Sequence, residues 1–211
     1  MPTDEQVFFS DIAGSLKKAT SALKRADVPF LLGGSLACWV RGGPETRKDL
    51  DLMVREEDAE RALAALVADG MRPERPPEDW LLKAYDGDVM IDLIFRAMGL
   101  PITDEVLGRG DEHNVFSIRM NVMALEDVIS TKLLALDDHF LDYESLLQIA
   151  RSLREQVDWA EVRSRTKDSP YARTFFVLLN ELGVVPAETI RSSESGDSGE
   201  KRIRVVPASG E

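Results

Sequence analysis

The 211-residue sequence contains little of the chemistry that supports disulfide-linked, zinc-binding or membrane-embedded proteins. Its one cysteine, Cys38, excludes a disulfide within the chain, and its two histidines, His113 and His139, lack partners at the spacing of zinc ligands. No stretch approaches the roughly 18 uninterrupted apolar residues that span a membrane. The acidic N-terminal residues also lack the apolar segment of a secretory signal. We therefore expect a cytoplasmic protein that does not contact a membrane.

Positive charge is scarce as well, because 26 Lys and Arg residues face 38 Asp and Glu residues and give a formal net charge of -12. Residues 191–211 are neutral overall, so the acidic excess lies on residues 1–190. This balance disfavours broad, non-specific contact with nucleic acid, in which Lys and Arg must neutralise phosphates. A small basic cleft remains compatible with it. The 44% of hydrophobic residues is typical of a globular domain, here with room for an appended helical part.

Hydrophobic periodicity predicts a mixed structure in the first 122 residues. A capping box from Thr3 to Gln6 opens an amphipathic helix over residues 4–25. Further helices are predicted over residues 36–40 and 57–69, strands over 30–32, 50–54, 81–85, 89–95 and 115–120, and a loop over 72–78. The pair Asp86-Gly87, between two of these strands, is the strongest hairpin signal in the chain.

From Leu125 onward the pattern is helical, and the predicted helices cover residues 125–136, 143–155, 159–167 and 171–182. Beyond residue 190, the Ser, Gly and Glu composition is typical of a flexible tail. The sequence therefore predicts an α+β fold, in which a small mixed β-sheet flanked by helices is followed by a helical C-terminal half. The three parts are expected to span residues 1–122, 123–190 and 191–211.

Residues that can bind phosphate and metal fall in separate stretches. Gly33, Gly34 and Ser35 lie between a predicted strand and a predicted helix, where backbone N–H groups can hold an anion and glycine lets a phosphate approach closely. Asp49 and Asp51 are two positions apart on the next strand, so their side chains project from one face of it.

Asp92 is a third carboxylate, and it interrupts the apolar run over residues 89–95. A carboxylate there must lie at an edge, accept hydrogen bonds or bind a metal, because burying it without a partner is costly. Neighbouring carboxylates repel each other unless a cation lies between them. Ligands that offer only oxygen suit Mg²⁺ whose coordination is completed by substrate phosphates.

In this order and on these elements, the glycine–serine loop, the paired aspartates and the later strand aspartate resemble the nucleotidyltransferase superfamily with the polymerase-β-type palm. The helical half carries a further resemblance through Lys132 on a helix and Asp142 after it. This pattern is similar to that of AbiEii/MenT-like bacterial toxin nucleotidyltransferases and their small antibiotic-modifying relatives.

The resemblance implies that Asp49, Asp51 and Asp92 are both catalytic residues and ligands of two Mg²⁺ ions, with Asp92 helping to deprotonate the acceptor hydroxyl. Two metals about 3.5–4 Å apart stabilise the attacking and leaving oxygens of such a displacement. The nucleoside triphosphate, for example ATP, is expected to contact Gly33, Gly34, Ser35, Arg47, Lys48, Lys132 and Asp142.

Several of these residues also have purely structural interpretations. Lys132 can be a helix lysine that extends its ammonium to solvent, and Asp142 can be a helix N-cap. Arg47 and Lys48 can be solvated loop charges, although a triphosphate beside them would be well bound. Relatives carry Lys or Arg before the later aspartate, whereas this chain has Leu141.

The reaction that these residues indicate is Mg²⁺-dependent transfer of a nucleoside monophosphate from an NTP to an acceptor hydroxyl, with release of pyrophosphate. The resemblance to toxin-type enzymes favours tRNA as the acceptor and an antitoxin as a partner protein. The net negative charge favours the alternative, a small hydroxylated molecule of the antibiotic type. A non-catalytic nucleotide-binding module with the same fold is the third interpretation.

Overall fold

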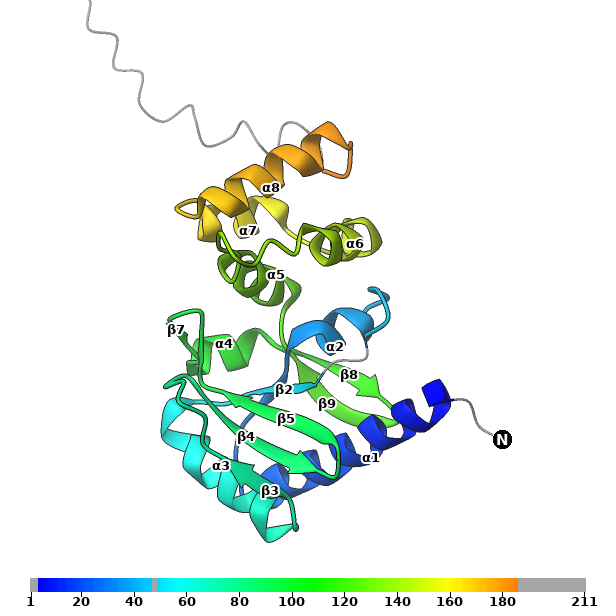
Figure 1. Cartoon of the computed structure of the whole chain (residues 1–211), viewed down its shortest axis with the longest axis vertical. Helices are drawn as coiled ribbons and strands as arrows, with labels where there is room; N and C mark the ends of the chain where they lie inside the picture. The colour runs from blue at the N-terminus through cyan, green and yellow to red at the C-terminus, as the bar shows by residue number, and fades with distance from the viewer. Residues whose placement is uncertain (1–3, 47–48, 186–211) are drawn as a thin grey trace, which may run out of the picture.

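The structure, a computed structural model, describes residues 4–46 and 49–185, so Thr3, Arg47, Lys48 and the predicted tail at 191–211 lie outside it. A seven-stranded sheet with the order β3-β4-β5-β2-β1-β9-β8 forms the first part (Figure 1). Its strands are β1 (Leu31–Leu32), β2 (Leu50–Met53), β3 (Arg72–Glu74), β4 (Leu81–Asp86), β5 (Val89–Ile94), β8 (Asp111–Val115) and β9 (Ile118–Val122). The predicted α+β class with a mixed sheet is confirmed.

Helices α1 (Asp4–Arg25) and α3 (Glu56–Ala68) cover one face of the sheet, and α2 (Gly34–Trp39) lies between the sheet and the helical part (Figure 1). The alternation of side chains along a strand explains why one face of the sheet is apolar and covered while the other carries polar residues. On β2, Leu50 and Leu52 are fully buried, while Asp51 between them projects from the opposite face and is only half-buried. The face that α1 and α3 leave uncovered is therefore the one that presents the carboxylates.

The C-terminal part consists of α5 (Leu125–Leu134), α6 (Tyr143–Leu153), α7 (Trp159–Thr166) and α8 (Pro170–Glu181), as the sequence predicts. Side-chain caps fix three of the four starts, and two of them lie at α7 and α8: Asp158 accepts a hydrogen bond from the Glu161 amide, and Ser169 accepts one from the Ala172 amide. Pro170 occupies the first turn of α8, where its missing N–H costs nothing. Among the residues described, no helix combines the length and apolarity needed to cross a membrane.

Two predictions between α3 and β5 were wrong in detail. Residues 72–74 form the edge strand β3 instead of a loop, because an edge position tolerates Pro73, which has no N–H to donate. The hairpin turn lies at Gly87-Asp88, not at Asp86-Gly87, with Gly87 at φ +63°. Asp86 instead extends β4, and its carboxylate accepts hydrogen bonds from side chains of α1.

The stretch between β5 and β9 holds elements that the sequence pattern did not reveal. They are β6 (Arg96–Ala97), β7 (Leu100–Pro101), α4 (Asp104–Arg109) and β8. β8 is almost entirely polar because it is an edge strand, so it lacks the apolar alternation that identifies a strand. The strand predicted over 115–120 occupies 118–122, since Phe116 and Ser117 both adopt positive φ and form the β8–β9 turn.

A buried carboxylate joins the sheet to the helical part. Asp127 on α5, whose side chain is 7% exposed, accepts two hydrogen bonds from Arg109 of α4, at 3.0 and 2.8 Å, and one from Arg165 of α7, at 2.6 Å. Charge-assisted, forked contacts of this kind are the strong class of hydrogen bond. Asp127 therefore ties three elements from both parts of the molecule together.

We expect Asp127→Ala to lower the free energy of unfolding by about 3 kcal/mol, because it leaves two arginines around an emptied, desolvated position. Chemical denaturation measures the change. Glu161→Ala is the matched control: Glu161 pairs with Arg165 on the exposed surface, and its loss should cost less than about 1 kcal/mol. Equal effects of the two substitutions would contradict the role assigned to Asp127.

Candidate active site

The loop from β1 into α2 packs directly against β2. The Gly33 amide donates a hydrogen bond of 2.8 Å to the Asp51 carbonyl, and Gly34 adopts φ +60°, a conformation that favours glycine. A Cβ atom on Gly34 would lie 1.7 Å from Asp51 Oδ2. The carboxylate of Asp51 therefore rests against bare backbone, and no side chain larger than hydrogen fits at Gly34 without displacing it.

The two strand aspartates lie side by side. β2 and β5 are parallel neighbours, and their register places Asp51 directly opposite Asp92. Partners in register project from the same face of a sheet, so both side chains lie on the face that α1 and α3 leave open. Asp49, just before β2, is exposed. Two carboxylates from strands far apart in sequence are thus direct neighbours, while Asp49 lies two positions before Asp51, just outside β2.

The electrostatics of this group favour the binding of a cation. Burial, followed by the charges of Asp92 and Asp49, raises the pKa of Asp51 to about 6, against the opposing effects of Lys132 and Lys83. Burial also raises the pKa of Asp92, although a hydrogen bond from Lys83 lowers it. Carboxyl groups that resist ionisation next to one another are relieved when a positive ion binds between them.

The donor set fits Mg²⁺ better than a softer metal. Within residues 4–46 and 49–185, no group of three or more His, Cys, Asp or Glu side chains lies close enough together to hold a metal ion, so the structure does not gather all three predicted aspartates into one such group. Asp49, Asp51 and Asp92 offer only carboxylate oxygens, which is how proteins bind Mg²⁺ through one or two carboxylates plus the phosphates of a substrate. The residues therefore suit an ion that arrives with a nucleotide.

Ser35 and Lys132 meet across the junction between the two parts. Lys132 on α5 donates a hydrogen bond of 3.0 Å from Nζ to Ser35 Oγ, although 97 positions separate the two residues. The ammonium also lies near enough to Asp51 to lower its pKa. The structure thus brings Ser35 and Lys132 close to the carboxylates. Lys132 therefore does not simply extend its ammonium from α5 into solvent.

Asp142 caps a helix, which is the structural interpretation that the sequence offered for it. It is the N-cap of α6, and its carboxylate accepts a hydrogen bond of 3.1 Å from the Ser145 amide. A cavity of about 220 Å³ lies between the start of α6 and the loop after α2, lined by Ser35, Pro44, Glu45, Thr46, Ser145, Gln148 and Ile149. Ser35 therefore faces a space beside α6, whereas Asp142 is not among the lining residues.

Lys83 is a site residue that sequence reasoning missed. Its Nζ donates a hydrogen bond of 2.8 Å to Asp92 Oδ1, and its side chain is 18% exposed. The β4–β5 register pairs Lys83 with Asp92 because the turn lies at Gly87-Asp88. A turn at Asp86-Gly87 would instead pair Lys83 with Met90. The correct turn position was the signal that could have identified this contact.

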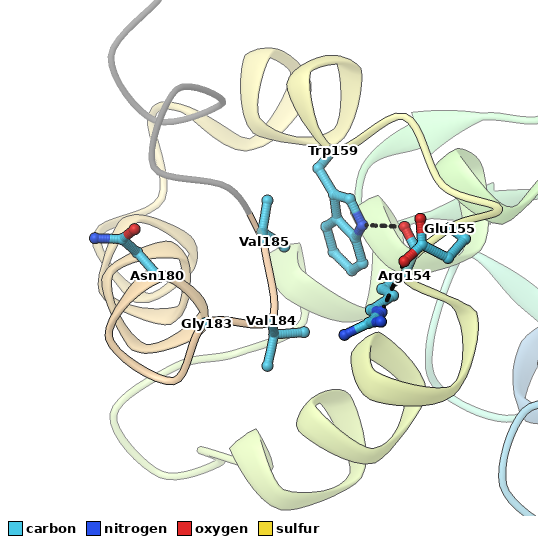
Figure 2. Close-up of a pocket in the computed structure, with 7 residues that line it drawn as sticks. All are labelled: Arg154, Glu155, Trp159, Asn180, Gly183, Val184 and Val185. Atoms are coloured by element: carbon cyan, nitrogen blue, oxygen red, sulfur yellow. Dashed lines mark hydrogen bonds and ion pairs between the residues drawn. The ribbon is translucent and has the colours of Figure 1, made fainter.

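A second cavity, of about 360 Å³, lies in the helical part and is shown in Figure 2. It is lined by Arg154, Glu155, Trp159, Asn180, Gly183, Val184 and Val185. Trp159 donates from its ring nitrogen to the Arg154 carbonyl at 2.9 Å, so this polar group is already satisfied. None of the predicted catalytic residues lines this cavity, and the carboxylate face of the sheet remains the candidate active site.

Comparison with solved structures identifies antibiotic-modifying enzymes among those with a similar fold. The antibiotic-resistance factor ANT(2'')-Ia, in solution, aligns with a TM-score of 0.53 and 19% identity over 81% of this chain and 96% of its own. A crystal structure of ANT(2'')-Ia in complex with adenylyl-2''-tobramycin aligns with a TM-score of 0.53 and 16% identity over 79% and 97%. The lincomycin-bound lincosamide adenylyltransferase LnuA aligns with a TM-score of 0.46 and 13% identity over 64% and 94%.

Curated protein sequences give no significant match to the chain. The model of a protein family described as "uncharacterised nucleotidyltransferase" matches residues 11–182, which include the glycine loop, the three aspartates and Lys132. The match covers most of the chain and both parts of the fold. The chain therefore belongs to this nucleotidyltransferase family.

Proposed function

We propose that the protein is a Mg²⁺-dependent enzyme that transfers a nucleoside monophosphate from an NTP to a hydroxyl group of a small molecule and releases pyrophosphate. The observation that carries this proposal is the registered pair of Asp51 and Asp92 on the uncovered face of the sheet, with Asp49 beside it. Membership of a nucleotidyltransferase family supports the reaction class.

In this reaction the acceptor oxygen forms a bond to the α-phosphorus as the bond from that phosphorus to the bridging oxygen breaks, and pyrophosphate leaves. Asp49, Asp51 and Asp92 would hold Mg²⁺, which neutralises charge on the phosphates when it is bound. The carboxylate of Asp92 would accept the proton from the acceptor hydroxyl, a role that its raised pKa suits. Transfer of this type otherwise requires mainly positioning and charge neutralisation.

The triphosphate would lie near the junction of Ser35 and Lys132. The Lys132 ammonium and the Ser35 hydroxyl are 3.0 Å apart and can both donate to phosphate oxygens. A side chain at Gly34 would displace the Asp51 carboxylate and one at Gly33 would collide with Met53, so glycine at both positions preserves the placement of the carboxylate against the loop. Arg47 and Lys48 follow the same loop in the sequence and remain predicted phosphate contacts.

A small acceptor is better supported than tRNA. A net charge of -12 repels a polyanion but attracts a cationic small molecule. The complex of ANT(2'')-Ia with adenylyl-2''-tobramycin shows a protein of similar fold with a nucleotidylated antibiotic. We therefore propose a hydroxylated small molecule, preferably cationic, as the acceptor.

The proposal is tested by incubating the protein with each of the four labelled NTPs, Mg²⁺ and a panel of hydroxylated cationic molecules, including aminoglycosides. We expect mass spectrometry to detect an acceptor heavier by one nucleoside monophosphate, and pyrophosphate in equal amount. Asp51→Asn and Asp92→Asn should each lower the rate by at least about a hundredfold, because each removes a charge required in the transition state.

A parallel reaction contains bulk tRNA in place of the small molecules. Transfer to tRNA, with none to the panel, would overturn the proposed acceptor class and favour the toxin-type enzyme, with its antitoxin partner. Nucleotide binding without transfer to either acceptor would favour a non-catalytic module. Glu60→Gln, on the exposed surface of α3 where Glu60 pairs with Arg75, is a control that should retain activity.

The raised pKa of Asp51 also predicts a pH-dependent effect on stability in the absence of metal. The carboxyl titrates near 3.9 in an unfolded chain and near 6 in the folded protein. Above pH 6 the Asp51 carboxyl is ionised in both states, and its charge lowers the free energy of unfolding by about 2–3 kcal/mol, at about 1.4 kcal/mol per pKa unit. Below pH 4 the carboxyl is protonated in both states, and this destabilisation disappears.

Asp51→Asn should therefore be more stable than the native protein at pH 8 in EDTA, and the difference should close as the pH falls from 6 to 4. Urea denaturation at several pH values measures both proteins. A difference of equal size at pH 4 and pH 8 would show that the Asp51 charge does not oppose folding. Added Mg²⁺ should stabilise the native protein more than the variant, since it binds the carboxylate that the variant lacks.

A further inference from the structure

Lys83 belongs to a row of charged side chains that crosses four strands of the sheet. Glu74 of β3 is paired with Lys83 of β4, Lys83 with Asp92 of β5, and Asp92 with Asp51 of β2. Side chains paired in this way lie on one face at the distance of direct neighbours. The ammonium of Lys83 thus lies between the carboxylates of the candidate site and the edge of the sheet.

The contact between Lys83 and Asp92 is close and partly shielded from water. Nζ lies 2.8 Å from Asp92 Oδ1 and 3.4 Å from the sulfur of Met90, and the two charged side chains are 18% and 14% exposed. Within the part of the chain that the structure describes, Lys83 is the side chain that hydrogen-bonds to Asp92. Its position holds one carboxylate oxygen and leaves Oδ2 for another partner.

We propose that Lys83 is a positioning residue for nucleotidyl transfer, an inference that rests on the proposed function. It fixes the orientation of Asp92 beside Asp51 and balances their charge before a metal ion arrives. The ammonium competes with the divalent ion for Asp92, so the carboxylates bind metal weakly until a nucleotide brings additional phosphate ligands. Asp92 would then use Oδ2 to bind the metal ion or to accept the proton, while Oδ1 keeps its hydrogen bond from Lys83.

The same strand offers a matched ion pair with no place in the site. Lys18 of α1 lies 2.5 Å from Asp86 at the end of β4, with both side chains partly exposed. This pair connects a helix to the sheet, on the side away from the Asp51–Asp92 pair. Lys18→Met therefore removes the same kind of charge and contact as Lys83→Met without changing the charge around Asp92.

The experiment compares Lys83→Met, Lys83→Arg and Lys18→Met with the native protein. For Lys83→Met we expect a fall in kcat of roughly tenfold to a hundredfold, the range for one hydrogen bond to a charged group, with KM for the NTP changed less than about threefold. Lys83→Arg should recover most of kcat, because guanidinium also binds carboxylate. Lys18→Met should retain native kcat.

Binding of Mn²⁺ to the nucleotide-free proteins, followed by electron paramagnetic resonance, gives a second readout that does not require activity. Lys83→Met should bind Mn²⁺ several-fold more tightly than the native protein, because the competing ammonium is gone, and Lys18→Met should bind it with native affinity. A residue that only stabilises the fold would not tighten metal binding.

An unchanged kcat in Lys83→Met overturns the proposal, and so does a lowered kcat with unchanged or weaker Mn²⁺ binding. If the native protein transfers no nucleotide, the proposed function fails, while the Mn²⁺ affinities still decide whether Lys83 competes with metal. If neither the native protein nor Lys83→Met binds Mn²⁺, both the metal site and the role of Lys83 are wrong.

Discussion

The repulsion between Asp51 and Asp92 is the constraint on which the site depends. Parallel pairing of β2 and β5 places these carboxylates next to each other, partly buried, so that the pKa of Asp51 reaches about 6. A sequence selected only for stability would avoid such a pair, because it opposes folding at neutral pH. Stored electrostatic strain of this kind is typical of sites that bind a cation or move a proton.

The residues around these two carboxylates either make room for them or offset their negative charge. Gly34 gives the Asp51 carboxylate room against the backbone, Lys83 holds one oxygen of Asp92, and Lys132 brings a positive charge from the helical part. The buried Asp127 ties α5, which carries Lys132, to α4 and α7. The helical part therefore supplies the ammonium of Lys132 to the site, and it also contributes to the stability of the molecule.

The sequence predicted most of this arrangement, for identifiable reasons. The α+β class and the four C-terminal helices followed from strong periodicity, and the placement of Asp51 followed from the period of two in a strand. The polar edge strand β8 and the short β3 could not be recognised, because their pairing comes from neighbouring strands and not from their own residues. Lys83 was missed because a turn displaced by one residue changes every cross-strand partner.

The central claim is that the carboxylates of this face hold a divalent ion together with a triphosphate. Crystals grown with Mn²⁺ and an unreactive NTP analogue, and measured near the manganese absorption edge, test it directly. We expect anomalous density within about 2.2 Å of oxygens of Asp51 and its neighbouring carboxylates, with the triphosphate extending toward Ser35 and Lys132. Manganese bound elsewhere, or a triphosphate away from Asp51, would contradict the account.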